Sequence, residues 1–281
     1  MKPIDGANPE DASFNPPPPV LCEYCGQPRH WRGIAFGANP RWTFVAACEC
    51  EGAKAEKERI KREEAEAARK EEERRALEER KSRIAHLIGT SGLGRRFKAR
   101  TFAAFVPGEG TEGAYQKAVG YAKHFELMTS DPRLQERNGL FITGDVGTGK
   151  THLAAAVANE LLGRGVPVVF ATMIDLLQKL KETFETGGEA ALLRAYIDAD
   201  LLIIDDLGKE QPTEWAATKI YQIINARYED FKPIIVTSNY SLDELVKRMT
   251  PKSGDNSTAL ATVDRLREVL HLVPLSGESH R

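Results

Sequence analysis

The segment that most restricts the fold is the glycine-rich run GDVGTGKT at Gly144–Thr151. It follows a short apolar stretch, GLFIT at 139–143, and precedes an amphipathic stretch, HLAAAVANELL at 152–162. Gly144 and Gly149 allow the backbone to wrap tightly, so that successive N–H groups point inward, and the following helix N-terminus adds partial positive charge. This strand–loop–helix order therefore predicts a binding site for phosphate groups at the loop.

The rest of this region alternates between strand-like and helix-like patterns. The strand-like runs are short, β-branched and nearly continuous, as expected for strands buried on both faces: GLFIT (139–143), VPVVFAT (166–172), LLIID (201–205), PIIVTSN (233–239) and HLVPL (271–275). Amphipathic stretches lie between them at 152–162, 175–184 and 213–230, and Ser241 with Glu244 predicts a capping box at a further helix. We therefore expect an α/β fold in which helices flank a parallel sheet.

Side chains suited to nucleotide hydrolysis accompany the glycine-rich run and two of the strands. Lys150 can reach the β- and γ-phosphates, and Thr151 offers a hydroxyl to Mg²⁺. The run LLIIDDLG ends in Asp205, placed to hold Mg²⁺, and Asp206, placed to polarise the attacking water. Asn239 can orient water or contact the γ-phosphate, although Asn at a strand end is also a common turn residue. The combination predicts nucleotide binding and hydrolysis.

These motifs resemble those of the additional-strand P-loop ATPases of the AAA+ group. More narrowly, they are similar to the DnaC/DnaI-type replicative helicase loaders and their relatives, the IstB-type transposition ATPases. The resemblance is carried by GDVGTGKT, LLIIDDLGKE, TSNYS, TVDRLRE and the terminal GESHR, and it covers about residues 90–281. It implies ATP with Mg²⁺, a Walker A segment at 144–151, a Walker B pair at Asp205 and Asp206, and a sensor 1 role for Asn239.

The resemblance also implies roles for two arginines. Arg265 in DRL matches the arginine finger of the family, which acts in trans on the nucleotide of a neighbouring subunit, and Arg281 matches the sensor 2 arginine. A surface salt bridge for Arg265 and a frayed end for Arg281 are the alternatives. The sequence departs from the family in having Asp206 where many members have Glu, which predicts slow turnover, and in ending after its last strand, which predicts no C-terminal helical lid.

The predicted nucleotide site follows from these assignments. The catalytic candidates are Lys150, Asp205, Asp206, Asn239 and Arg265. The ATP-binding candidates are Gly144, Asp145, Val146, Gly147, Thr148, Gly149, Lys150, Thr151, His152 and Arg281. The candidate magnesium ligands are Thr151 and Asp205.

A second candidate site lies near the N-terminus, where the four cysteines of the chain occur as CxxC at Cys22 and Cys25 and as CxC at Cys48 and Cys50. Two close thiolate pairs suit tetrahedral Zn²⁺, which can fold a segment too small to build its own core. His30 is a substitute for one ligand, and a redox pair or buried thiols are alternatives to the metal. The stretch between the pairs predicts two aromatic-rich strands around a Gly/Asn/Pro turn, as in a zinc ribbon.

Charge and composition divide the chain into four parts. The formal net charge of -2, from 39 Lys+Arg and 41 Asp+Glu, argues against bulk electrostatic binding of nucleic acid. We expect a disordered Pro-rich tail at 1–20, a zinc-binding module at 21–52, a charged helical linker at 53–88 and an AAA+ ATPase core at 89–281. The linker pattern of acid-before-base pairs predicts a solvated helix, with docking on a partner as the alternative.

Contacts with DNA are therefore expected to be local, in two places. The segment GRRFKAR carries Arg95, Arg96, Lys98 and Arg100, and in the related family this stretch usually packs near the adenine, so a DNA contact and a nucleotide contact both remain open. The helix expected at 175–184 occupies the region where initiator-type relatives contact single-stranded DNA. Its lysines could equally form a solvated face.

Without a membrane-spanning apolar run or a signal-like N-terminus, the sequence predicts a cytoplasmic protein. The resemblance implies an ATPase that loads a replicative hexameric helicase onto single-stranded DNA, with ATP binding and hydrolysis as the assembly and release switch. In related loaders a zinc-bound N-terminal module grips the helicase. Self-association through Arg265 is expected, and no apolar run is long enough to cross a membrane. The alternatives are an IstB-like transposition ATPase acting on duplex DNA and an ATP-binding switch with negligible turnover.

Overall fold

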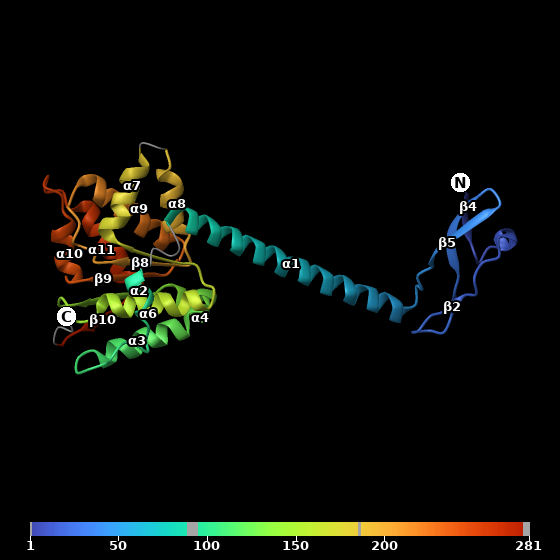
Figure 1. Cartoon of the computed structure of the whole chain (residues 1–281), viewed down its shortest axis with the longest axis horizontal. Helices are drawn as coiled ribbons and strands as arrows, with labels where there is room; N and C mark the ends of the chain where they lie inside the picture. Colours follow the sequence, from blue (N-terminus) through green and yellow to red (C-terminus); the bar gives the residue numbers. More distant parts are fainter. Residues whose placement is uncertain (1, 89–94, 185–186, 278–281) are drawn as a thin grey trace. The chain divides into compact units, whose positions relative to one another are not determined.

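The computed structural model describes residues 2–88, 95–184 and 187–277 (Figure 1). The chain divides into two compact units, Met1–Leu77 and Glu78–Arg281. Each unit is described by itself below. Among the described residues, no helix is long and apolar enough to cross a membrane.

The second unit is built on a parallel sheet of five strands in the order β10-β6-β9-β8-β7. The strands are β6 (Gly139–Gly144), β7 (Val168–Thr172), β8 (Leu201–Asp205), β9 (Ile234–Ser238) and β10 (Leu270–Leu275). β9 lies between β6, which leads into the glycine-rich loop, and β8, which ends in Asp205. This arrangement confirms the parallel α/β fold predicted from the apolar runs.

Alternate residues of each strand face opposite sides of the sheet, and each side carries its own apolar cluster. On one side Leu140 and Ile142 pack with residues of α3 (Glu112–Lys123) and α6 (Lys150–Gly163). On the other side Phe141 and Val236 pack with residues of the remaining large helices: α7 (Met173–Phe184), α8 (Glu189–Asp198), α9 (Glu214–Glu229), α10 (Leu242–Met249) and α11 (Ser257–Val269). Figure 1 shows helices on both faces of the sheet. The sheet is thus a middle layer, which explains why its strands lack a polar face.

Several helices of this unit carry no clear sequence signal. They are the short helices α2 (Arg95–Lys98), α4 (Phe125–Ser130) and α5 (Pro132–Gln135), together with α3 and α8. The predicted capping box is present, because Ser241 Oγ accepts from the Glu244 N–H and the Glu244 carboxylate accepts from the Ser241 N–H.

The first unit contains a small antiparallel sheet of three strands in the order β1-β4-β5. The strands are β1 (Lys2–Asp5), β4 (Trp31–Phe36) and β5 (Asn39–Val45), and β2 (Val20–Leu21) pairs separately with β3 (Pro28–Arg29). β4 and β5 form the aromatic-rich hairpin that the sequence between the cysteine pairs predicts.

The expectation of a disordered tail over residues 1–20 is wrong for the described part of that segment. β1 pairs with the edge of β4, where Ile4 lies opposite Gly33 and is buried. Asp11, in a short 3₁₀ helix (Pro9–Phe14), accepts hydrogen bonds from the Asp5 N–H and from Lys2 Nζ. Proline content predicted solvation, but a sheet edge offers unpaired backbone groups that a short strand can satisfy.

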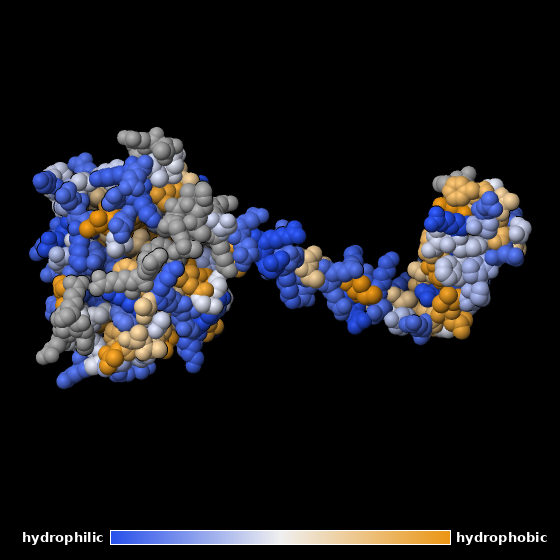
Figure 2. All heavy atoms as spheres, viewed as in Figure 1, coloured by the Kyte–Doolittle hydropathy of each residue, from blue (hydrophilic) through white to orange (hydrophobic). Residues whose placement is uncertain are grey.

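The helix α1 (Glu51–Ile88) matches the predicted charged linker closely. Ion pairs at helical spacing lie along it, including Glu66 with Lys70 and Glu71 with both Arg74 and Arg75. These groups are exposed, so solvent screens each pair and its contribution to helix stability is small. Figure 2 shows the predominantly hydrophilic surface of this helix.

Candidate functional site

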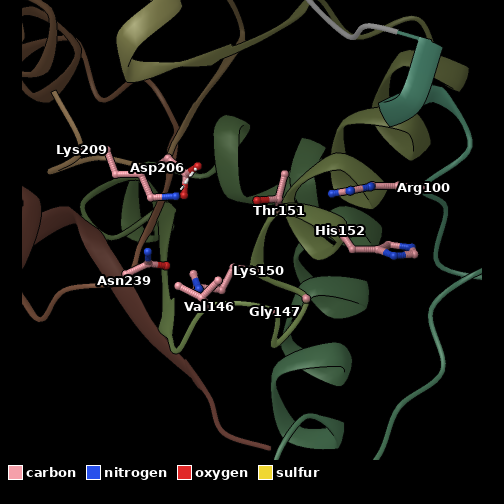
Figure 3. A pocket seen from close by; sticks show the side chains of 10 residues that line it. Arg100, Val146, Gly147, Lys150, Thr151, His152, Asp206, Lys209 and Asn239 are labelled. Carbon is pink, nitrogen blue, oxygen red and sulfur yellow. Dashed lines mark ion pairs between the residues drawn. The ribbon is translucent and has the colours of Figure 1, made fainter. Parts of the chain in front are cut away.

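A pocket in the second unit gathers many of the sequence-predicted nucleotide residues at the carboxyl ends of the strands, while Gly144, Asp145, Thr148 and Asp205 are not among its lining residues (Figure 3). Its lining consists of Arg100, Val146, Gly147, Gly149, Lys150, Thr151, His152, Asp206, Lys209 and Asn239. Parallel α/β sheets bind ligands at this edge, because the loops that leave the strands meet there. Arg100 belongs to the basic segment for which contacts with DNA and with nucleotide were both open, and Lys209 is the lining residue to which the sequence gave no role.

The glycines of the loop are required by close backbone approach. A Cβ at Gly144 would lie 2.1 Å from the Leu275 carbonyl oxygen, and its φ of +153° is one that L residues rarely adopt. A Cβ at Gly149 would lie 2.8 Å from the Phe105 ring, again at positive φ, directly before α6 begins at Lys150. The loop can therefore present its N–H groups together with the helix N-terminus to an anion.

Lys150 is held inside this loop. Its Nζ donates to the carbonyl oxygens of Gly144 at 2.8 Å and Asp145 at 2.6 Å, and the residue is 5% exposed. Burial lowers the pKa of the Lys150 ammonium, opposed by the charge of Asp206 and reinforced by the charge of Lys209. A phosphate anion would supply the counter-charge that these neutral carbonyl partners lack.

Asp205 and Thr151 form the corner suited to a divalent cation. Thr151 Oγ1 donates to Asp205 Oδ1 at 2.9 Å, and Thr237 Oγ1 donates to the same oxygen at 2.6 Å. Burial raises the pKa of the Asp205 carboxyl, although both hydroxyl contacts oppose that shift. A desolvated carboxylate beside a hydroxyl, at the mouth of a phosphate loop, fits the oxygen ligand set that Mg²⁺ prefers. Thr237, on the interposed strand β9, had no signal in the sequence.

Asp206 occupies an unusual backbone position next to this corner. Its φ is +61°, in the left-handed region, and its N–H donates to Thr237 Oγ1 at 2.9 Å. Its carboxylate forms an ion pair with Lys209 Nζ at 2.8 Å. Backbone strain of this kind is commonly found at functional sites. Asn239 lines the same pocket, where Figure 3 shows it beside Lys150 and Val146.

The segment that includes Phe97 and Arg100 packs against α6. Asn159 Nδ2 donates to the carbonyl oxygens of Phe97 and Arg100, and a hydrogen bond of 3.0 Å links the His152 ring to the Thr101 carbonyl. Burial lowers the pKa of His152. Of the basic segment expected to touch DNA or nucleotide, Arg100 lines the nucleotide pocket; the side chains of Arg95 and Arg96 lie outside the described residues.

Arg265 lies on α11 against α9, among residues that do not line this pocket. Its Nε donates to Asn225 Oδ1, and its guanidinium lies over the rings of Tyr221 and Tyr228 at 4.9 and 5.6 Å. These contacts are with neutral groups, so the surface salt bridge that was the alternative to an arginine finger is not formed among the described residues. Arg281 lies outside the described residues.

The four cysteines come together in the first unit. The sulfur atoms of Cys22, Cys25, Cys48 and Cys50 all lie within 4.8 Å of one another, with 3.9 Å between Cys22 and Cys50 and 3.5 Å between Cys25 and Cys48. Tetrahedral Zn–S bonds of about 2.3 Å place sulfur atoms roughly 3.8 Å apart, so the donor set fits zinc. The cluster includes Cys50 and does not include His30.

The surroundings of the cluster shift the pKa values of two thiols in opposite directions. Hydrogen bonds from the Tyr24 and Cys25 N–H groups lower the pKa of Cys22 to about 6. The Gln27 N–H lowers the pKa of Cys25, but contacts with the Cys48, Cys50 and Cys22 sulfurs together with burial outweigh it and raise that pKa to about 12. Four sulfurs so close together are not all ionised without a cation between them, which again suits a metal.

Comparisons with known proteins agree with this geometry. The family profile of IstB-like ATP binding proteins matches residues 116–281, more than half of the chain. The replicative helicase loader DnaC of Escherichia coli (strain K12) is 32% identical over 149 residues, which make up 52% of this chain and 58% of that protein. The protein described as the ATP-binding protein of insertion sequence IS5376 in Geobacillus stearothermophilus is 35% identical over 166 residues, 59% of this chain and 64% of that protein.

Among solved structures, the replication initiator DnaA bound to AMPPCP and single-stranded DNA matches with a TM-score of 0.51 and 27% identity, over 66% of this chain and 51% of that chain. This confirms the predicted AAA+ P-loop core. The chain spans less than two thirds of the length of the two curated relatives.

Proposed function

We propose a function for this chain, which belongs to the family of IstB-like ATP-binding proteins. In this proposal it is a Mg-ATP-dependent loader and places a replicative hexameric helicase on single-stranded DNA. The observation that carries the proposal is the pocket in which Lys150, Thr151 and Asp206 meet beside Asp205, in a core similar to the E. coli loader DnaC. Binding of ATP would favour assembly, and hydrolysis would favour release.

In this proposal the pocket residues divide the work of phosphoryl transfer. The N–H groups of Gly147 and Gly149 and the Lys150 ammonium hold the phosphates, while Thr151 and Asp205 hold Mg²⁺. An Mg²⁺ ion held by these residues would supply positive charge to the phosphate oxygens. Asp206 and Asn239 orient the attacking water. The short side chain of Asp206 and its ion pair with Lys209 support slow turnover in the unassembled chain.

Arg265 would complete the site of a neighbouring subunit. It lies outside the pocket of its own chain, and its guanidinium donates to Asn225 Oδ1 and the Ala261 carbonyl and lies over two tyrosine rings, with no ion pair to Arg265 among the described residues. A cation that keeps its charge uncompensated in this way can act on the phosphates of another subunit. Self-association on ATP is therefore part of the proposal.

The first unit would hold the helicase. We propose a zinc-binding module at 21–52, to whose hairpin β1 from outside that range adds a third strand, a charged helical linker at 53–88 and an ATPase core at 89–281. Apolar side chains of the module remain exposed, among them Leu21, Tyr24, Phe36 and Phe44, and Figure 2 shows apolar surface on this unit. Apolar patches exposed in this way are typical of surfaces that bind proteins.

Single-stranded DNA would contact the surface of α7. Ile174 is half exposed there, and Lys181 Nζ lies 5.3 Å from the centre of the Trp215 ring. Lysines pair with phosphates and aromatic rings stack with bases, which is the combination that single-strand binders use. The DnaA relative bound to single-stranded DNA supports this choice of ligand. Trp215 was not singled out by the sequence.

Transposition is the second candidate, because the insertion-sequence relative is 35% identical to this chain. A protein of that class would assemble with ATP on duplex DNA and would not bind a helicase. The preference for single-stranded or duplex DNA, together with helicase binding, therefore distinguishes the two functions.

The test is size-exclusion chromatography of the full chain with a purified replicative helicase, with and without Mg-ATP, followed by ATPase assays on single-stranded and duplex DNA. We expect a complex with the helicase and stimulation of ATP hydrolysis by single-stranded DNA. In Lys150→Ala, which cannot hold the phosphates, we expect both to be lost. Absence of a complex with and without ATP contradicts loading. Stimulation by duplex alone supports transposition, and undetectable turnover under all conditions supports a binding switch.

An equal mixture of Arg265→Ala and Lys150→Ala chains tests the action in trans. We expect the Lys150→Ala chain to donate Arg265 to the intact pocket of the other variant, so that part of the activity returns. Two inactive variants that stay inactive when mixed contradict a role for Arg265 across subunits.

A further inference from the structure

The nucleotide pocket contains cations beyond the lysine of the phosphate loop. Lys209 follows β8 by four residues and lines the pocket together with Lys150 and Asn239. Its Nζ pairs with Asp206 Oδ2 at 2.8 Å, and Figure 3 shows this ion pair on the side of the pocket opposite Arg100. The phosphate-loop and two-acid motifs assign no role to a lysine at this position.

The backbone that carries Lys209 is firmly held. Its N–H donates to the Asp206 carbonyl at 3.3 Å, and the Asp206 N–H is anchored on Thr237. The buried carboxylate of Glu210 accepts from the Gly208 N–H at 2.8 Å, at a glycine with a φ of +92°. The turn from Asp206 to Glu210 is therefore fixed at three points. Movement of the Lys209 ammonium requires rotation of its flexible stem and no change of the backbone.

The partners of the ion pair are accessible from the pocket. The side chains of Lys209 and Asp206 are 38% and 30% exposed, so solvent screens their attraction and the pair is weak. A terminal phosphate carries more negative charge than a carboxylate and offers three acceptor oxygens. Such a group placed beside Lys150 and Asn239 would compete for the Lys209 ammonium.

We propose that Lys209 exchanges Asp206 for the γ-phosphate when ATP binds. Without a γ-phosphate, the Lys209 ammonium forms an ion pair with the carboxylate of Asp206. With it, Lys209 pairs with a γ-phosphate oxygen, and the freed carboxylate of Asp206 can accept a hydrogen bond from the attacking water. Lys209 thereby distinguishes ATP from ADP. The same exchange frees the Asp206 carboxylate for the attacking water when ATP is bound. This inference rests on the proposed binding of ATP and names a further residue of that site.

The test measures the dissociation constants of Mg-ATP and Mg-ADP for the full chain by displacement of a fluorescent nucleotide. In Lys209→Met we expect ATP to bind about five- to tenfold more weakly, the loss of roughly one charge-assisted hydrogen bond, while ADP binding changes less than about twofold. Lys209→Arg, which keeps the charge, should retain most of the preference. Lys252→Met removes an exposed lysine outside the pocket and serves as the control.

A second pair of variants tests the exchange itself. In Asp206→Asn, Lys209 has no carboxylate to leave, so ATP binding should tighten about two- to fivefold, and Lys209→Met added to that variant should remove the gain. Equal losses for ATP and ADP in Lys209→Met, no loss for either, or no coupling between the two positions would each overturn the proposal. A wild-type chain that binds neither nucleotide would instead contradict the proposed function.

Discussion

The ATPase core and the cysteine-bearing unit maintain their folds by different physical means. In the core, strand residues such as Ile203, Ile235 and Val236 are fully buried beneath helices on both faces. In the first unit Ile4, Cys22 and Ala35 are buried, while Phe36 and Phe44 remain more than half exposed. Hydrophobic burial is sufficient for a large layered core, whereas a small sheet depends on a cross-link that ties its ends together.

The largest effect is expected when one of the four clustered thiols is removed. In Cys22→Ser, or after strong chelation, we expect zinc content to fall from about one ion to none per chain and the β4 and β5 amides to lose hydrogen-exchange protection. Structural zinc contributes about 10–16 kcal/mol to such small folds, more than the unit can replace. The core amides and ATP binding should stay unchanged.

Glu23→Gln provides the control for this change, since it alters an exposed neighbour of Cys22 and leaves the sulfur cluster intact. Full protection of β4 and β5 in zinc-free Cys22→Ser would contradict the view that this unit depends on metal.

The core is expected to respond most strongly to Arg227→Met. Arg227 is 1% exposed, and its guanidinium donates to the carbonyl oxygens of Tyr196, Ile197, Ala199 and Pro233. Removing these donors leaves buried acceptors unsatisfied, which we expect to cost about 3–5 kcal/mol of unfolding free energy. Urea unfolding measures the loss. The exposed Arg194→Met serves as the control, and equal stability of the two variants would contradict the structural role.

Substitution of Asp205 should raise the stability of the core, whereas substitution of Arg227 lowers it, because the buried charge of Asp205 opposes folding. Burial raises its pKa above the ordinary value of 3.8, so the folded chain holds this proton more tightly than the unfolded chain does. The contribution of this residue to stability is complete below pH 3.8 and is lost as the pH rises through the raised pKa. Asp205→Asn should therefore raise the melting temperature at neutral pH by about 2–4 °C without Mg²⁺, while weakening Mg-ATP binding.

Melting curves at several pH values, in the absence of Mg²⁺ and nucleotide, test this prediction. The gain of Asp205→Asn over the wild type should grow with pH, while the exposed Asp264→Asn should show no such trend. A gain that is the same at every pH would show that the carboxylate charge is not the cause.

The smallest effect is expected in α1. Its exposed ion pairs, such as Glu56 with Arg59 and Glu66 with Lys70, weaken when salt screens them. Raising the salt concentration to about 1 M, where the screening length is roughly 3 Å, should modestly speed amide exchange in the middle of α1 and leave the strands of the core unaffected. Unchanged exchange in α1 would indicate that helix propensity, and not charge pairing, sustains it.

Local patterns made much of the molecule predictable. The β-branched runs gave the five core strands within about two residues, because burial on both faces demands apolar residues at every position. The aromatic hairpin between the cysteines and the charged helix were equally clear. The pairing of β1 was not, since four residues near a proline-rich stretch carry no periodicity that distinguishes a strand from a solvated tail.

In the candidate site too, only residues that belong to a local sequence pattern could be predicted. Lys150, Thr151, Asp205 and Asp206 belong to contiguous motifs whose spacing reports their chemistry, so the sequence by itself determined a phosphate loop, an acid pair and a cluster of four thiols. Thr237 and Lys209 lie inside these quoted motifs without a chemical signal of their own, and the basic run that ends at Arg100 left contacts with DNA and with nucleotide both open. Only the tertiary structure decided their places, because sheet order sets Thr237 beside Asp205 and packing on α6 turns Arg100 toward the pocket. Such convergence depends on contacts between residues far apart in the chain, which short-range patterns do not encode.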